Sequence, residues 1–89
     1  MIETKVIIIN KYGLHARAAA KFVNTAKAYS SVINIGRNDE LIDGKSIMSV
    51  MMLAAGKGTV LDLQIDGSDE GDALEALQIL IANRFDEAE

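Results

Sequence analysis

The residue best suited to chemistry is His15, the only histidine in the chain. An imidazole has an unperturbed pKa of about 6.5, so near neutral pH it offers a ring nitrogen with a free lone pair. Gly13 lies two residues earlier and allows a sharp turn, while an alanine-rich helical pattern begins at Ala16. His15 is therefore predicted to stand at the amino-terminal boundary of a helix.

The first turn of that helix is suited to hold an anion. The first N–H groups of a helix lack internal acceptors, and the helix dipole adds partial positive charge there. We expect the amides of Ala16, Arg17 and Ala18 to act as such donors, and the guanidinium of Arg17 to bind phosphate oxygens. These features predict that His15 accepts a phosphoryl group. On local evidence alone, a histidine that only decorates or caps the helix remains the alternative.

The sequence shows no means of obtaining that group from a nucleotide. It has no Gly-rich phosphate-binding loop of the P-loop type and no second histidine, and the segment 56–59 is better interpreted as a helix stop and turn. With no cysteine and one histidine, a metal site is not expected either. We therefore predict a phosphoryl carrier without metal or cofactor, which depends on a donor enzyme and an acceptor protein.

Hydrophobic spacing predicts a single α+β domain over residues 1–89. Its four-stranded antiparallel sheet is expected to expose one face to solvent and to be covered by helices on the other. The first helix is expected to bury an arc made of Ala16, Ala19, Ala20, Val23 and Ala26. Ser68 is the expected cap of the last helix, and 86–89 are expected to form a frayed acidic tail. The predicted strands are 4–10, 31–36, 40–43 and 59–66, and Arg37, Asn38 and Asp39 connect the second strand to the third. The predicted helices are 16–28, 47–55 and a longer one that ends near 83–84.

Charge is distributed unevenly along the chain. The net charge is −4, but residues 1–60 sum to +4 and residues 61–89 to −8. The basic part contains His15 and suits an anionic ligand or an acidic partner, whereas the overall charge argues against a nucleic-acid binder. Neither a secretory signal nor a run long enough for membrane insertion is present, so a cytoplasmic protein is expected.

The second predicted helix combines a capping serine with an unusual apolar content. Ser46 is the expected cap, and a regulatory site is the less favoured local interpretation. The apolar side chains would ordinarily belong to the core, but so short a helix cannot bury all of them, and methionine also suits surfaces that meet several partners. These side chains are Ile47, Met48, Met51 and Met52.

Two segments of the chain resemble the HPr family, the histidine phosphocarriers of the bacterial phosphoenolpyruvate-dependent sugar phosphotransferase system (PTS). Gly-Leu-His-Ala-Arg-Ala-Ala at 13–19 is similar to the family's active-site signature, and 45–55 resembles its regulatory serine site and second helix. The resemblance implies an open-faced two-layer sandwich of order βαββαβα. Its sheet order would be 1-4-2-3, with three helices on one face.

The resemblance also implies partners and residue roles. Enzyme I would phosphorylate His15 on Nδ1, Arg17 would assist, and the group would pass to a histidine of enzyme IIA domains. Ser46 would be the target of HPr kinase/phosphorylase, and residues 47, 48, 51 and 52 would dock partners. We expect a monomer.

Two alternatives stay open, and one departure from the family pattern bears on the site. The chain could serve a nitrogen-related or otherwise regulatory phosphorelay without sugar transport, or, as a less favoured reading, it could be a binding module without chemistry. Many family members have proline where this chain has Ala18. Alanine gives up the preset backbone angle of proline but keeps an N–H near the phosphate.

Overall fold

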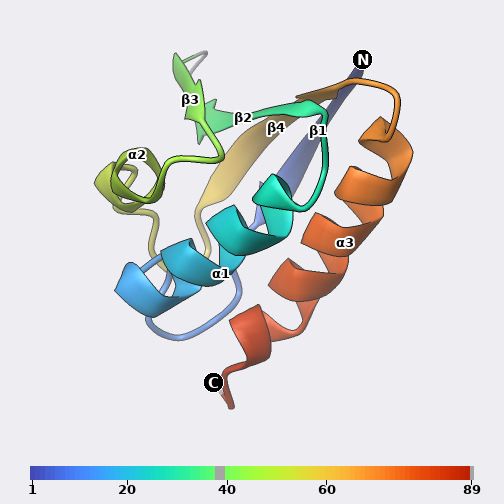
Figure 1. The fold of residues 1–89 in the computed structure, drawn as a ribbon. Helices are drawn as coiled ribbons and strands as arrows, with labels where there is room; N and C mark the ends of the chain where they lie inside the picture. Colours follow the sequence, from blue (N-terminus) through green and yellow to red (C-terminus); the bar gives the residue numbers. More distant parts are fainter. Residues whose placement is uncertain (38–39, 89) are drawn as a thin grey trace.

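The fold is an α+β sandwich, shown in Figure 1 as a computed structural model that describes residues 1–37 and 40–88. The connector residues Asn38 and Asp39, and Glu89 of the predicted tail, lie outside the described residues. The elements are β1 (Ile2–Ile7), α1 (Ala16–Lys27), β2 (Val32–Arg37), β3 (Glu40–Asp43), α2 (Ile47–Met52), β4 (Val60–Asp66), α3 (Glu70–Ala82) and the short 3₁₀ turn η1 (Arg84–Asp86). None of the described helices is long and apolar enough to cross a membrane.

The four strands form one antiparallel sheet in the order β1-β4-β2-β3, which confirms the order that the family resemblance implied. The alternation predicted for β4 is also confirmed. Leu61, Leu63 and Ile65 are buried, while the polar residues between them face the open side. β4 lies between β1 and β2 and pairs with both, so its apolar face forms the centre of the core.

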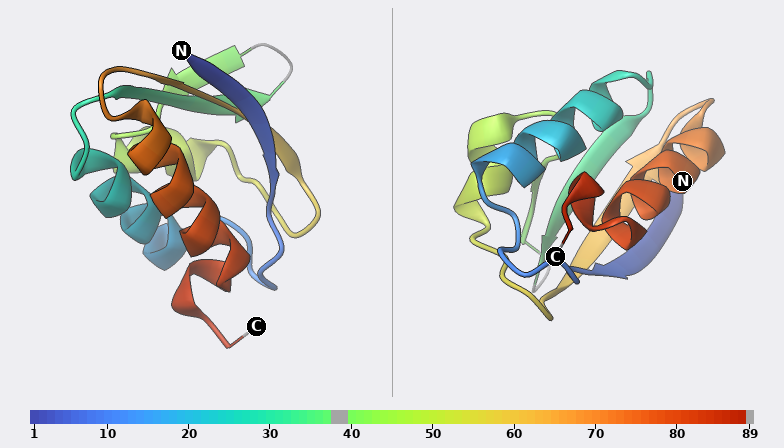
Figure 2. Two further views of the ribbon diagram at one scale, coloured as in Figure 1. Left: turned by 90° about the vertical axis from the view of Figure 1, so that its right-hand side faces the viewer. Right: turned by 90° about the horizontal axis from the view of Figure 1, so that it is seen from below.

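The helices lie on one side of the sheet and leave the other side open (Figure 2). The buried face of α1 is rotated relative to our prediction: Ala16 is exposed and Ala20 is only partly buried. The large ring of Phe22 is fully buried against the sheet and sets this rotation. The buried residues of α1 are Ala18, Ala19, Phe22, Val23 and Ala26.

Several element boundaries differ from the prediction. β1 runs from Ile2 to Ile7 rather than from 4 to 10, because its pairing with β4 begins with Ile2 opposite Ile65. α2 ends at Met52 instead of Ala55, since Ala54 has a positive φ of 49° that no right-handed helix can accommodate. The predicted 47–55 helix was therefore too long.

The cap of α3 is Asp69, so the prediction of Ser68 was wrong. The Asp69 carboxylate does not cap its own helix. It accepts bonds from the backbone N–H groups of Ser30, at 2.8 Å, and Ser31, at 3.0 Å, and from both serine hydroxyls. These bonds tie the start of α3 to the loop between α1 and β2, and they lower the pKa of Asp69 to about 2, the Ser31 hydroxyl contributing most.

We call the hydrogen bonds from Ser30 and Ser31 to the Asp69 carboxylate the Asp69 clamp, and they predict how the stability of the protein depends on acid pH. The pKa of Asp69 is depressed from 3.8 to about 2, so its stabilisation is fully present above pH 3.8 and is lost as the pH falls to about 2. In Asp69→Asn, the free energy of unfolding should be lower at neutral pH and should fall less than that of wild type over this interval. Chemical denaturation at several pH values measures both effects.

Asp72→Asn is the matched control, because it removes an equal charge from an exposed position in the first turn of the same helix. Its acid profile should follow that of wild type. Equal profiles for Asp69→Asn and wild type would contradict the clamp.

Candidate functional site

The turn before α1 presents His15 at the helix entrance. Gly13 has φ of +65°, and a Cβ there would overlap the carbonyl oxygen of Ala55. The N–H of Leu14 donates to that same carbonyl at 2.8 Å, and the Leu14 side chain is buried. The loop after α2 thus fixes the backbone next to His15.

His15 caps α1 through its own imidazole. Its backbone is extended, with φ of −73° and ψ of 178°, and its Nδ1 accepts a hydrogen bond from the N–H of Arg17 at 3.3 Å. A nitrogen that accepts an N–H bond carries no proton of its own. In the neutral ring, therefore, the proton is on Nε2 and the Nδ1 lone pair points towards the amino terminus of the helix.

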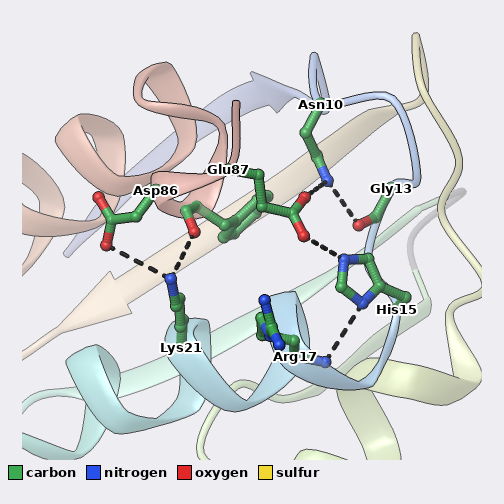
Figure 3. A network of polar contacts seen from close by, with 8 residues as sticks. Asn10, Gly13, His15, Arg17, Lys21, Asp86 and Glu87 are labelled. Atoms are coloured by element: carbon green, nitrogen blue, oxygen red, sulfur yellow. Dashed lines mark hydrogen bonds and ion pairs between the residues drawn. The ribbon is translucent and has the colours of Figure 1, made fainter. Parts of the chain in front are cut away.

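The carboxyl-terminal tail completes the site, contrary to our prediction that it is frayed (Figure 3). After α3 the backbone enters a left-handed turn at residues 84–86, and the ring of Phe85 is fully buried. Glu87 then extends towards His15, and its Oε2 lies 2.5 Å from Nε2. The apolar Phe85 side chain anchors the acidic residues that follow it.

Glu87 is bound on two sides. Its Oε1 accepts a bond from Asn10 Nδ2 at 2.8 Å, and the same nitrogen donates to the Gly13 carbonyl at 2.8 Å. Burial by itself would raise the pKa of Glu87, but the bonds from Asn10 and His15 and the nearby positive charge of Arg17 outweigh it and lower the pKa below 4.5. Glu87 is therefore a carboxylate at neutral pH.

Lys21 connects the tail to α1. Its Nζ donates to the Phe85 carbonyl at 2.9 Å and lies 3.7 Å from the Asp86 carboxylate. A hollow of about 370 Å³ lies between this part of the tail and the helix, and Arg17, Lys21 and Tyr12 contribute to its walls. Two cations of α1 thus border an open space beside His15.

The structure brings most of the predicted site residues together. His15, Ala16, Arg17 and Ala18 form the N-cap and first turn of α1, and Arg17 is exposed. The Arg17 N–H already donates a hydrogen bond to the His15 imidazole. It is therefore not free, in this state of the ring, to serve as one of the predicted phosphate-binding amides.

Ser46 and the second helix lie next to this centre. Ser46 caps α2 as predicted, its Oγ accepting the N–H of Ser49 at 3.3 Å. Of the α2 side chains, only Val50 is buried. The four predicted docking residues are exposed, namely Ile47, Met48, Met51 and Met52, with Met48 at 75% and Met52 at 80%. We refer to these four residues as the α2 apolar patch.

Sequence reasoning missed Asn10, Lys21 and Glu87. One signal for the tail was available: Phe85 is the only aromatic residue after Tyr29 and directly precedes an acidic segment. A lone aromatic side chain in such a segment favours docking over fraying. Nothing comparable marked the contact between Asn10 and Glu87, because these two residues are 77 positions apart. Within 1–37 and 40–88, no cluster of three or more metal-ligating side chains is present.

Comparison with known proteins identifies the family and the fold. The family model described as "PTS HPr component phosphorylation site" matches residues 2–83. The chain belongs to the HPr family. The phosphocarrier protein HPr of Pseudomonas aeruginosa is 62% identical over 90 residues, and that of Neisseria meningitidis serogroup A is 51% identical over 89, each covering all of both chains.

A solved structure extends the match to the backbone. The crystal structure of HPr-C-His from Thermoanaerobacter tengcongensis is 43% identical, with a TM-score of 0.94 and complete coverage of both chains. The chain is therefore an HPr-family phosphocarrier of the phosphotransferase system, which makes it a carrier and not a catalyst.

The buried Phe85 ring predicts that the tail depends on one anchor. Phe85→Ala should lower the free energy of unfolding by about 3 to 5 kcal/mol, the range for a buried phenylalanine, and should release residues 86–88 from the site. Denaturant unfolding measures the first effect and amide hydrogen exchange at Glu87 the second.

Ile79→Ala on α3 serves as the control, because that side chain is 53% exposed. It should change stability by less than about 1 kcal/mol and leave exchange in the tail unaltered. Wild-type exchange at Glu87 in Phe85→Ala would show that the ring does not hold the tail.

Proposed function

We propose that this HPr-family protein accepts a phosphoryl group from enzyme I on Nδ1 of His15 and passes it to a histidine of enzyme IIA domains in the cytoplasm. The observation that carries the proposal is the hydrogen bond from the Arg17 N–H to Nδ1, which leaves the lone pair of that nitrogen facing the amino terminus of α1. Sugar uptake is the proposed purpose of the relay, as the family implies, and the acceptor proteins would distinguish it from a purely regulatory relay.

The helix terminus supplies what a metal ion supplies in many phosphoryl transfers. As phosphorus bonds to Nδ1, its oxygens come within reach of the first amides of α1 and of the exposed guanidinium of Arg17. The N–H of Arg17 is released from the ring as Nδ1 uses its lone pair, so it becomes free to donate to a phosphate oxygen. The transferred phosphoryl group is thus stabilised by groups of this chain, while the donor enzyme supplies the phosphoryl group and keeps the leaving group.

The α2 apolar patch supports docking beside this centre. α2 packs beside α1, and the Leu14–Ala55 hydrogen bond joins the segment after α2 to the residue before His15. The large exposed area of Met48 and Met52 suits a partner surface, because methionine adapts to different apolar shapes. One docking surface would then serve the donor and the acceptors in turn.

The central test is phosphorylation in a purified system. Wild-type protein incubated with phosphoenolpyruvate and enzyme I should acquire an acid-labile phosphate, detected by mass spectrometry before and after acid treatment. His15→Ala should acquire none, whereas Ser46→Ala should behave as wild type because it retains His15. Absence of the adduct on wild type would overturn the proposal.

We further propose that Ser46 is a regulatory phosphorylation site for HPr kinase/phosphorylase. Ser46→Asp should keep the cap of α2, since aspartate caps helices as well as serine does, so stability should change little. The added negative charge borders the α2 apolar patch and should weaken binding to enzyme I. The dissociation constant should rise about tenfold, equivalent to ~1.4 kcal/mol. Calorimetric titration measures this constant.

Gln78→Glu is the control for charge alone, because it places one extra carboxylate at an exposed position of α3. It should bind enzyme I as wild type does. If Ser46→Asp also bound as tightly as wild type, the proposed regulatory effect would be wrong.

A further inference from the structure

We propose that Glu87 is a positioning residue for phosphoryl transfer, holding the proton of His15 on Nε2 so that Nδ1 stays free to react. The inference rests on the proposed function of His15 and adds a residue from the far end of the chain. It assigns a role to the tail, which the comparison with the family model does not reach, since that match ends at residue 83.

The geometry places the carboxylate where only one ring nitrogen can meet it. Glu87 Oε2 lies 2.5 Å from Nε2, on the side of the ring opposite to the Arg17 N–H that bonds Nδ1 (Figure 3). A carboxylate can only accept hydrogen bonds, and a backbone N–H can only donate them. Both contacts therefore select the same tautomer, with the proton on Nε2. Within the described ranges, Glu87 is the one acidic side chain in contact with the ring.

Asn10 is oriented to hold this carboxylate. It is fully buried, and its Nδ2 donates to Gly13 O and to Glu87 Oε1. Its Oδ1 is buried without a partner among the described residues, which is an unfavourable arrangement for a polar atom. The reversed amide would place Oδ1 against two acceptors, so the observed orientation follows from the presence of Glu87 and the turn carbonyl.

The tail is also fixed mechanically, so the carboxylate is preorganised. Phe85 is buried in the core two residues before Glu87, and Lys21 binds the Phe85 carbonyl. The side chain of Glu87 is only 15% exposed, whereas that of His15 is 35% exposed. The ring thus remains accessible to a partner while its Nε2 side is occupied by the tail.

The positioned proton matters for the transfer step itself. The Nδ1 lone pair forms the bond to phosphorus as the bond from phosphorus to the donor's leaving group breaks, and the electron pair of the broken bond stays on that leaving group. The His15 proton need not leave, because it already resides on Nε2. The positive charge that the ring gains lies next to the Glu87 carboxylate, which favours the transition state over the neutral ground state.

The test uses the full chain with three substitutions. Glu87→Ala removes the acceptor, Glu87→Gln keeps a carbonyl acceptor without the charge, and Asp86→Ala removes a neighbouring tail carboxylate that contacts Lys21 instead of His15. The tautomer is read from the ¹⁵N chemical shifts of the His15 ring at alkaline pH, where an imidazole is neutral. The second readout is the single-turnover rate of phosphorylation by enzyme I, as a function of enzyme I concentration.

We expect wild type and Asp86→Ala to show Nε2–H alone and equal rates. Glu87→Ala should show a mixture of tautomers and a maximal rate about tenfold lower, with an unchanged half-saturating concentration, and Glu87→Gln should fall between them. A purely structural role for the tail would not move the ring nitrogen shifts.

The outcomes separate the two proposals. If Glu87→Ala kept the wild-type tautomer, or reacted within twofold of the wild-type rate, the positioning role would be wrong while the carrier function stood. If wild type itself took no phosphate from enzyme I, the carrier function would fail, and the positioning role with it.

Discussion

The cap that His15 makes on α1 is the interaction on which the site depends. A side chain that caps a helix must point its acceptor at the first free amides, and here the acceptor is Nδ1, which binds the Arg17 N–H. The bond that stabilises the helix end therefore also orients the nucleophile. When phosphate replaces the lone pair as the acceptor, the same amide has a stronger partner, because charged acceptors form stronger hydrogen bonds. The Nδ1 of His15 and the N–H of Arg17 thus both stabilise the helix end and take part in the proposed chemistry.

The uneven charge of the sequence is brought together by the fold. The chain's basic part contributes Arg17 and Lys21 on α1, and its acidic part returns Asp86 and Glu87 to the same helix. Glu87 places its negative charge against the His15 ring, Asp86 lies beside Lys21, and Arg17 stays exposed. A partner that approaches the site meets the guanidinium and the imidazole, with the acidic tail behind the ring.

The site is braced from two remote segments. Ala55, after α2, accepts the Leu14 N–H immediately before His15, while the tail after α3 supplies Glu87. Because the backbone before His15 and the imidazole itself are hydrogen-bonded to remote segments, the position of the ring depends on the packing of the whole domain. The clamp between Asp69 and the serines after α1 secures that packing at the opposite end of the helix.

Much of this protein was determined by its sequence alone. Local signals sufficed for the strand and helix order, for the position of His15 at the start of a helix, for the cap at Ser46, and for the apolar face of β4, because these features depend on periodicity and on neighbouring residues. The His15 and Ser46 motifs also indicated the HPr family. Only the tertiary structure decided the rotation of α1 onto Phe22, the early end of α2 and the contacts that the docked tail makes. These depend on contacts between distant residues, such as Glu87 with Asn10 and His15, and no local pattern encodes the free energy of bringing such residues together.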